Sequence, residues 1–507
     1  MAETFPNTPQ QDAFLVALLN TTANLALVAR AGCGKTSTIM IAAKAVADAA
    51  KAAGNRVEIL VLAYNKANAK EAEQRLVESG LNDWRTAQAS TLHALGFSLL
   101  KFHYRLTRDS IDDKKVQKLV ASSNNEIAAK YGPQVVSLVC YAKQAGVGFF
   151  ADLPIGNVQV WHDLAAHYDI NGLDETDEAE EIVDAAIAIY KASLAQTDVI
   201  DFDDMILFPL IKNIRVKFGK DLIFLDEAQD LSRSRQALAR KFLKTGSGRM
   251  VVVGDDRQAI YGFSGADSAA LDNLIKGLNA TVLPLSVTWR CPKAVVRLAQ
   301  TIVPDIEAAA SAREGEVIYL QELPEDLRRT DAILCRNTAP LIPMAYSLIR
   351  RGIPCKVEGR QIGDGLINLA QRWKIKTIDA LLNRLDDYLE RELQKAAAKG
   401  EEEKAEVKTD TVNTLREIAQ QCLLEDRKTV GDVVEFIERL FADDVSGVLT
   451  LCTYHRSKGR EWPRVLLFEH NKRCPSKGAR QDWQMVQEDN LAYVAFTRAQ
   501  QTLAFIN

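Results

Sequence analysis

The stretch NLALVARAGCGKTSTIMIAAKAVADAAKAA, residues 24–53, decides the fold class of this chain. Its apolar start, 24–29, predicts a short buried strand, and the alanine-rich residues 36–53 predict a helix. Similar apolar runs recur along the chain at 57–63, 222–225, 249–253, 281–285, 331–335, 447–452, 464–468 and 502–506. Strands of this type with helices between them predict doubly wound α/β layers with parallel sheets, in which ligands lie at the carboxyl ends of the strands.

The strand and helix of this stretch are joined by ARAGCGKTS, residues 29–37, which is the setting of a phosphate-binding loop. The backbone N–H groups near Gly32 and Gly34 suit a β-phosphate, Lys35 supplies a positive charge, and the hydroxyl of Thr36 suits Mg²⁺. Ala29 stands where the usual pattern has its first glycine. By itself, the loop indicates nucleoside triphosphate binding and nothing more specific.

Composition sets wide limits. The 507 residues suggest more than one domain, and 63 basic against 67 acidic side chains give a net charge of −4, which excludes a histone-like polycation. The eight cysteines form no C-x-x-C pair, so a zinc site or disulfide scaffold is not expected. No apolar run approaches the roughly 18 residues of a membrane span, and the N-terminus MAETFPNTPQ lacks the features of a secretory signal. We therefore expect a cytoplasmic protein without a membrane partner.

Two long stretches break the alternation of strands and helices and predict mainly helical insertions, at 101–198 and 361–444. The charge-rich residues 390–408 within the second are expected to be solvated helix with a break near Gly400, rather than a docking site. The predicted domains are therefore one α/β domain from 1–100 and 199–285, a helical insertion 101–198, a second α/β domain from 286–360 and 445–507, and a short helical insertion 361–444.

A second polar motif follows the apolar run LIFL in LIFLDEAQD, residues 222–230. Two adjacent acids at the end of an apolar strand are costly without a cation, so Asp226 is a candidate to hold Mg²⁺ through water and Glu227 to polarise the attacking water. The alternative reading is a helix N-cap cluster that uses Asp226 or Asp230.

A third motif, VVVGDDRQAIYGFSGAD, begins at residue 251. Gln258 is a candidate γ-phosphate sensor, while Tyr261 and Phe263 offer flat faces to nucleic-acid bases, where stacking contributes about 1–3 kcal/mol per base. Each aromatic taken singly is more often a core residue.

The order and wording of these segments resemble the UvrD/Rep-like superfamily 1A helicases. Further segments resemble the other motifs of that family, namely NTPQQDAF (7–14), LAYNKANAKEAEQRL (62–76), STLHALGFSLL (90–100), VTWRCP (287–292), CTYHRSKGREWPRVLLF (452–468) and LAYVAFTRAQQTL (491–503). The resemblance implies two RecA-like P-loop NTPase domains with two mainly helical insertions, and ATP and Mg²⁺ as cofactors.

The resemblance also implies roles for individual residues. The catalytic set would be Lys35, Asp226, Glu227, Gln258, Arg290 and Arg498, with Thr36 and Asp226 at the metal. The remaining ATP-binding residues would be Gln10 and Trp289 at adenine, Glu461 near the ribose, and Ala31, Gly32, Cys33, Gly34, Ser37 and Gly459. The DNA-binding set would be Tyr64, Asn65, Lys66, Thr91, His93, Tyr261, Phe263, Thr453 and His455, although His93 and His455 are equally compatible with satisfied core histidines.

The chain departs from the family pattern at several points. Ser37 and Thr38 stand where an arginine usually follows the loop threonine, so one nucleotide contact is missing or moved. Tyr64 is one position out of register with the family's usual aromatic, and the AYNK wording is nearer the F-box DNA helicase branch. The second insertion is short for the family.

The resemblance therefore implies an ATP-dependent DNA helicase that moves 3′ to 5′ on single-stranded DNA and unwinds duplex at single-strand/duplex junctions. We expect a monomer with an unidentified recruiting protein. Two alternatives stay open. One is a translocase that strips proteins from DNA without efficient unwinding, and the other is a DNA-binding module switched by ATP.

Overall fold

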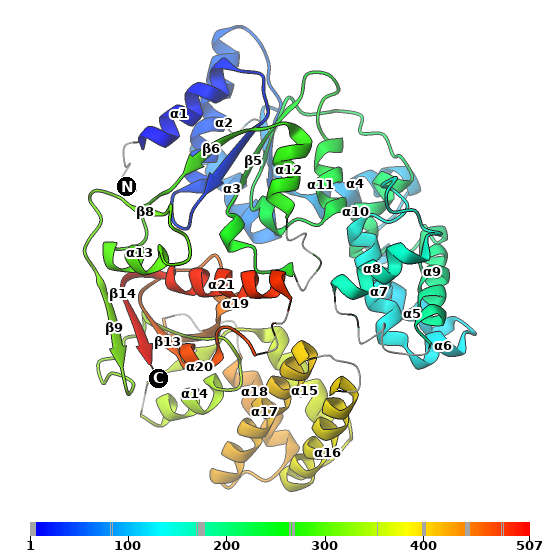
Figure 1. The fold of residues 1–507 in the computed structure, drawn as a ribbon, viewed down its shortest axis with the longest axis vertical. Coiled ribbons are helices and arrows are strands. Elements are labelled where there is room, and N and C mark those ends of the chain that lie inside the picture. The colour runs from blue at the N-terminus through cyan, green and yellow to red at the C-terminus, as the bar shows by residue number, and fades with distance from the viewer. Residues whose placement is uncertain are drawn as a thin grey trace. The chain divides into compact units, whose positions relative to one another are not determined.

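The computed structural model describes residues 7–506 apart from 82, 84, 169, 171–177, 263–264, 266–268, 352, 398–401, 442–446, 478 and 480. The chain divides into two compact units, Met1–Val287 and Thr288–Asn507, and each contains a parallel sheet with helices around it (Figure 1). This confirms the predicted α/β fold class with two RecA-like sheets, whereas the boundaries of the four predicted domains stay predictions.

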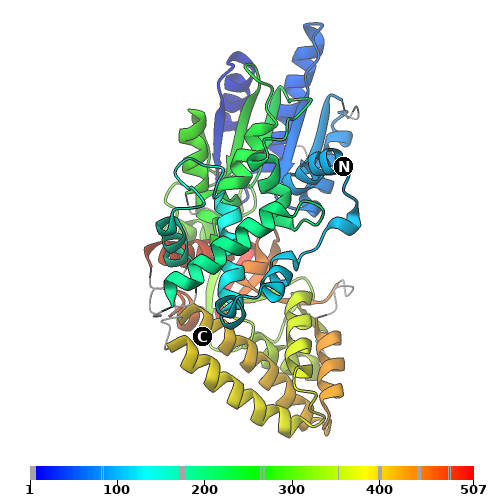
Figure 2. The ribbon, with the colours of Figure 1, turned by 90° about the vertical axis from the view of Figure 1, so that its right-hand side faces the viewer.

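The sheet of the first unit has six parallel strands in the order β3-β2-β4-β5-β1-β6. The strands are β1 (Leu25–Ala29), β2 (Ile59–Ala63), β3 (Ala87–Thr91), β4 (Leu222–Leu225), β5 (Arg249–Gly254) and β6 (Thr281–Leu285). Figure 2 shows these strands side by side. Because all six run the same way, the residues that follow them gather at one edge of the sheet.

Helices cover both faces of this sheet, as continuous apolar strands require. Side chains of α1 (Pro9–Asn20), α2 (Lys35–Ala52) and α3 (Lys66–Glu78) pack with Leu27 and Val61 on one face. Side chains of α4 (Leu92–Tyr104), α10 (Phe202–Ile211), α11 (Arg233–Lys241) and α12 (Ala270–Leu278) pack with Ala26 and Leu62 on the other. Neighbouring strand residues therefore point to opposite faces.

The stretch between α4 and α10 is helical and has its own apolar core, which includes Trp161 and Tyr190. Its elements are η1 (Arg108–Ser110), α5 (Lys115–Ser122), α6 (Glu126–Lys130), α7 (Gly132–Ala145), α8 (Val158–His167) and α9 (Ala179–Ala195). Lys115 and Lys143 of these helices form buried ion pairs with Asp204, 2.7 Å in each case, at the start of α10. The helical stretch is thereby fixed to the helix that covers the sheet.

The second unit has a six-stranded parallel sheet in the order β11-β12-β10-β13-β14-β9. Its strands are β9 (Glu316–Leu320), β10 (Ala332–Cys335), β11 (Cys355–Val357), β12 (Leu449–Thr453), β13 (Trp462–Phe468) and β14 (Ala499–Ile506), and a separate two-stranded sheet pairs β7 (Val287–Thr288) with β8 (Glu307–Ala308). Its helices are α13 (Lys293–Ala299), α14 (Leu341–Arg350), α15 (Arg360–Gln371), α16 (Ile378–Ala397), α17 (Glu402–Leu424), α18 (Val430–Leu440), α19 (Tyr454–Ser457), α20 (His470–Arg473) and α21 (Asp482–Phe496). Helices α15 to α18 are consecutive and share one core with α14 and the sheet.

The nine apolar runs of the sequence all form strands within three residues of their predicted bounds. Within the two six-stranded sheets, the strands that the sequence does not predict are β3, β9 and β11, and each of them lies at a sheet edge. The short strands β7 and β8 were not predicted either. An edge strand is partly exposed and needs no continuous apolar run, and β9 has no buried residue. The break expected near Gly400 lies outside the described residues. Within the described chain, no helix is long and apolar enough to cross a membrane.

The close approach of α4 to α10 yields a stability prediction. A Cβ at Gly96 would lie 1.9 Å from the carbonyl oxygen of Met205, which is backbone and cannot move aside. We expect Gly96→Ala to lower the free energy of unfolding by about 1–3 kcal/mol or more, because overpacking forces the two helices apart. Gly156→Ala, in an open loop of the same unit with no atom within 4 Å, is the matched control in urea unfolding. Equal loss in both variants would contradict the prediction.

Candidate functional site

The phosphate-binding loop joins β1 to α2 at the carboxyl edge of the first sheet. Gly32 and Gly34 adopt left-handed backbone conformations, with φ of 72° and 77°, which side chains disfavour. Gly34 is the N-cap of α2, and no side chain caps the first turn of the helix, which is the arrangement of an anion-binding helix N-terminus. Of the other predicted loop residues, Ala31 and Cys33 are buried, Thr36 is half-buried and Ser37 is exposed.

The predicted catalytic acids lie against this loop. Nζ of Lys35 is 3.0 Å from Oε2 of Glu227, which follows β4 in a left-handed conformation with φ of 49°. Burial alone would lower the pKa of Lys35, but the carboxylates of Glu227, Asp226 and Asp255 raise it. Burial and the neighbouring Glu227 raise the pKa of Asp226 to about 7.

This excess of buried carboxylate fits a divalent cation, because magnesium in triphosphate sites is held by one or two carboxylates together with phosphates and water. Asp226 and the hydroxyl of Thr36 are the protein groups predicted for that cation. Among the described residues, no group of three or more His, Cys, Asp or Glu forms a metal cage. The donor set therefore suits a cation that arrives with a triphosphate.

Gln258 is joined to the acids by a hydrogen-bonded network. Its Nε2 donates to Oδ2 of Asp255 (2.7 Å), the backbone N–H of Asp255 donates to Oε1 of Gln229 (3.1 Å), and Nε2 of Gln229 donates to Oε2 of Glu227 (2.5 Å). A Cβ at Gly254 would lie 2.7 Å from Oε1 of Gln229, so the glycine permits this close approach. The structure thus brings together Lys35 and the catalytic residues predicted after β4 and β5.

The two glutamines at the start of α1 have different partners. Gln10 exchanges hydrogen bonds with Ser286, donating to its hydroxyl (2.9 Å) and accepting from its backbone N–H (2.8 Å). Gln11 donates to the hydroxyl of Thr38 on α2 (2.8 Å). Gln10 therefore ties α1 to the end of β6, and its adenine-reading role stays a prediction.

The residues predicted to contact DNA in the first unit follow β2, β3 and β5, at the same edge of the sheet. The rings of Tyr64 and Tyr261 are parallel within 5°, with centroids 6.1 Å apart. His93 meets the edge of the Phe202 ring, and burial together with the charge of Arg235 lowers its pKa to about 4, so its imidazole is neutral at pH 7. Phe263 lies outside the described residues.

Three residues predicted to bind DNA serve as helix N-caps. Asn65 accepts from the backbone N–H of Asn68 (2.8 Å) at the start of α3, Thr91 does so at α4, and Thr453 at α19. Lys66 is exposed beside the first cap. Their side-chain oxygens thus have a structural role, and DNA contact by these residues stays a prediction.

In the second unit the structure gathers Arg290, Glu461 and Arg498. Nε of Arg290 donates to Glu461, whose other oxygen accepts from Gln500 (2.9 Å). Arg498 is 1% exposed and donates to the carbonyls of Val494 (2.8 Å) and Arg460 (3.2 Å) and to the hydroxyl of Thr497 (3.1 Å). Burial, and then the charge of Arg290, lowers the pKa of Arg498 to about 9. A buried guanidinium bonded to neutral oxygens gains energy from an incoming anion.

Trp289, Gly459 and His455, also predicted as site residues, lie close in sequence to Arg290 or Glu461. Trp289 is half-buried next to Arg290, and Gly459 has a φ of 82° in the turn between α19 and β13. Burial and the neighbouring Arg336 lower the pKa of His455 to about 3, so it is neutral. His455 is thus not suited to act as a phosphate-binding cation.

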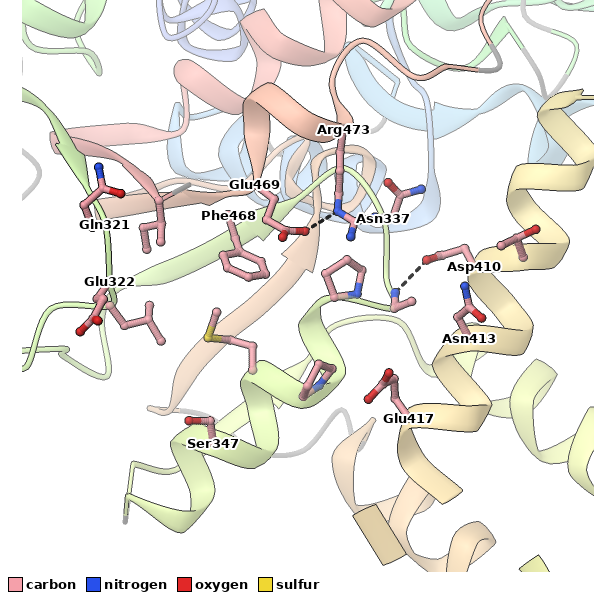
Figure 3. A pocket seen from close by; sticks show the side chains of 17 residues that line it. Gln321, Glu322, Asn337, Ser347, Asp410, Asn413, Glu417, Phe468, Glu469 and Arg473 are labelled. Atoms are coloured by element: carbon pink, nitrogen blue, oxygen red, sulfur yellow. Dashed lines mark hydrogen bonds and ion pairs between the residues drawn. The ribbon is translucent and has the colours of Figure 1, made fainter. Parts of the chain in front are cut away.

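A separate pocket of about 800 Å³ lies within the second unit, where β9, β10, β13 and β14 end (Figure 3). Phe468, Met344 and other apolar side chains form part of its lining. Its rim carries four carboxylates, of Glu322, Asp410, Glu417 and Glu469, but only one guanidinium, of Arg473. Asp410 accepts the N–H groups of Thr338 (2.9 Å) and Ala339 (2.8 Å) ahead of α14, and Arg473 donates to Glu469 (2.7 Å). This lining disfavours phosphate groups.

The sequence analysis missed three residues of the cluster around Lys35 and Glu227, namely Arg30, Gln229 and Asp255. Asp255 is fully buried after β5, and Arg30, which follows the neighbouring strand β1, forms an ion pair with it. The signal for Asp255 was available, because it follows a buried strand as Asp226 does. Arg30 reads in the sequence as an ordinary loop charge.

The fold and this constellation define a P-loop NTPase with two RecA-like sheets. Comparison with known families narrows the class: the family described as the UvrD/REP helicase N-terminal domain matches residues 7–279, and the UvrD-like helicase C-terminal domain matches residues 367–507. The chain belongs to the UvrD/REP helicase family, which confirms the resemblance found in the sequence.

Individual relatives carry helicase names. ATP-dependent DNA helicase UvrD1 of Mycobacterium bovis is 23% identical over 634 residues, covering 94% of this chain and 79% of that protein. A probable DNA helicase II homolog of Mycoplasma capricolum is 23% identical over 61% of this chain, and ATP-dependent DNA helicase Rep of Escherichia coli is 24% identical over 55%. The matched regions span 44% and 40% of the length of these two relatives.

The raised pKa of Asp226 predicts a gain of stability in Asp226→Asn. An acid whose pKa is about 7 in the folded chain and near 3.8 in the unfolded chain costs stability as the pH rises from about 4 to 7, and the cost persists above 7. In magnesium-free buffer, Asp226→Asn should therefore melt at a higher temperature than wild type at pH 8, and the difference should vanish near pH 4. Asp48→Asn, on the exposed side of α2, is the control. Equal melting temperatures of Asp226→Asn and wild type at pH 8 would contradict the raised pKa of Asp226.

Proposed function

We propose that this chain is an ATP-dependent DNA helicase that moves 3′ to 5′ along single-stranded DNA and unwinds duplex. One observation carries the proposal. In a chain of the UvrD/REP helicase family, the network of Lys35, Glu227 and Gln258 lies at the same sheet edge as the parallel rings of Tyr64 and Tyr261. The residues assigned to ATP hydrolysis and those assigned to base stacking thus follow strands of the same sheet edge.

The hydrolytic step is assigned to residues of the first unit. Glu227 would polarise the attacking water, Lys35 would neutralise charge on the β- and γ-phosphates, and Gln258 would sense the γ-phosphate. A magnesium ion, held through Thr36 and Asp226, would offset charge on the same oxygens when ATP is bound. Glu227 must then release Nζ of Lys35, which it contacts at 3.0 Å.

Coupling to movement is assigned to Arg290 and Arg498 of the second unit. Both guanidinium groups would neutralise the developing γ-phosphate charge, a contribution of about 10³- to 10⁵-fold in related NTPases. Loss of the γ-phosphate would then remove an interaction that the two units share, and bases would step across Tyr64 and Tyr261. Residues Trp289 and Glu461 would complete the nucleotide site. The monomeric state, the cytoplasmic location and the recruiting partner stay predictions.

A second candidate is a translocase that strips proteins from DNA without efficient unwinding. The observation that favours it is the short helical stretch α15 to α18, which limits the surface available for duplex separation. A pure ATP switch is disfavoured, because such a module needs no complete set of water-polarising acid, sensor and arginines.

The proposal is tested by ATP turnover and strand displacement. We expect single-stranded DNA to raise the ATPase rate, and duplex with a 3′ single-stranded tail to be unwound while duplex with a 5′ tail is not. An ATPase rate that single-stranded DNA does not change would contradict the helicase proposal. Translocation without strand displacement would select the stripping translocase, and unwinding from the 5′ tail would reverse the polarity.

Glu227→Gln tests the assignment of the water-polarising residue. The substitution keeps the shape of the side chain but removes its basicity, so we expect kcat to fall about 10²- to 10⁴-fold. ATP affinity should be kept or rise, because Lys35 loses a competing carboxylate. Glu78→Gln, on the exposed surface of α3, serves as the control for ATPase and nucleotide-binding assays. A variant with normal kcat would place the base elsewhere.

A further inference from the structure

Arg30 of the phosphate loop has an unusual position. It follows β1 directly, is only 9% exposed, and places NH1 3.0 Å from Oδ1 of Asp255 and 2.6 Å from Oδ1 of Asp256. Asp255 is completely buried, whereas the side chain of Asp256 is 42% exposed. A single guanidinium therefore joins the phosphate loop to two successive carboxylates after β5.

The main chain of Arg30 is also fixed. Its N–H donates to the carbonyl of Leu285 at the end of β6 (2.9 Å), and its carbonyl accepts the N–H (3.4 Å) and the thiol (2.6 Å) of Cys33. A planar guanidinium on an anchored backbone loses little additional side-chain freedom when it forms hydrogen bonds. The Arg30 side chain is thus held both by its backbone and by its ion pairs with Asp255 and Asp256.

Asp255 is the junction of the network. One of its oxygens binds Arg30 and the other accepts from Gln258 (2.7 Å), while its backbone N–H binds Gln229, which in turn contacts Glu227. Three residues beyond Gln258 the chain reaches Tyr261, whose ring is parallel to that of Tyr64. The segment 255–261 therefore carries both Gln258, assigned to the γ-phosphate, and Tyr261, assigned to base stacking.

We propose that Arg30 is a positioning residue that couples the nucleotide site to the polynucleotide site. It holds the segment 255–261 to the phosphate loop, so that DNA seated on Tyr261 changes the placement of Gln258 and the rate of turnover. This inference rests on the proposed function and concerns regulation of the same site. Arg30 is the arginine that the phosphate loop, residues 29–37, carries.

The coupling between ATP and DNA binding can be measured as a ratio of affinities. A residue with a merely structural role would not change this ratio. If ATP and DNA are coupled through Arg30, a non-hydrolysable ATP analogue changes the DNA affinity, and DNA changes the analogue affinity by the same factor. A substitution that only loosens the fold lowers the melting temperature without removing this factor.

The experiment compares wild type with Arg30→Gln, Arg30→Lys and Asp256→Asn. Single-stranded DNA affinity is measured with and without the analogue, and ATPase rates with and without DNA. Coupling factors between binding sites are typically about 5- to 150-fold. We expect Arg30→Gln to bring the analogue's effect on DNA affinity, and the DNA stimulation ratio, close to one. Arg30→Lys should restore part of both ratios, and Asp256→Asn, which keeps the buried pair with Asp255, should lower them least.

Arg249→Gln is the matched control. Arg249 lies at the opposite end of β5 and donates to the carbonyls of Leu18 and Thr21, so its loss removes two guanidinium hydrogen bonds away from the site. It should keep both ratios at the wild-type value. If Arg30→Gln is too unstable to purify, Arg30→Lys and Asp256→Asn decide the question with the same readouts.

The outcomes separate this inference from the proposed function. Wild-type turnover that DNA does not stimulate rejects both. Normal stimulation in wild type with unchanged ratios in the Arg30 variants rejects the coupling alone. Equal falls in melting temperature for Arg30→Gln and Arg249→Gln, with both ratios intact, assign Arg30 a purely structural role and overturn the proposal.

Discussion

The contact between Lys35 and Glu227 is the interaction on which the first unit's site depends. It holds a lysine of the phosphate loop against the acid that follows β4, at 3.0 Å. Around it, three cations, Arg30, Lys35 and Arg257, face four carboxylates, of Asp226, Glu227, Asp255 and Asp256. A partly buried group with this imbalance is costly in the absence of further positive charge. That cost is the physical reason to regard the cluster as a binding site rather than a structural ion-pair network.

The sheet makes the cluster possible. Parallel strands bring the residues after β1, β4 and β5 to one edge, although they are far apart in the chain: Arg30 and Asp255 are separated by 225 positions. Apolar packing on both faces fixes the strands, so the polar loops are the part of the unit that can respond to a ligand. Gly254 leaves the space that Gln229 needs to approach the end of β5.

The strands and site residues that the sequence predicts are those with a pattern in neighbouring residues. Continuous apolar runs such as 222–225 predicted the central strands, because strands buried on both faces need apolar side chains throughout. The edge strand β3 was missed, since only Ala87 of its residues is buried. Lys35 and Glu227 were predicted from motif wording. Arg30 was missed because its role depends on a partner in a distant segment, and no spacing rule links a loop arginine to an acid on another strand.

The second unit presents the opposite imbalance. Arg290 is paired with Glu461, but Arg498 is buried with bonds to carbonyl and hydroxyl oxygens, and its lowered pKa reflects desolvation and the neighbouring Arg290. Neither group of residues is balanced by its own charges: one has too many carboxylates, the other an uncompensated guanidinium. A magnesium-bound triphosphate carries both kinds of complementary charge, a cation for the first and a terminal anion for the second. Each imbalance, taken within its own unit, is therefore of the kind that binding of a magnesium-bound triphosphate would relieve.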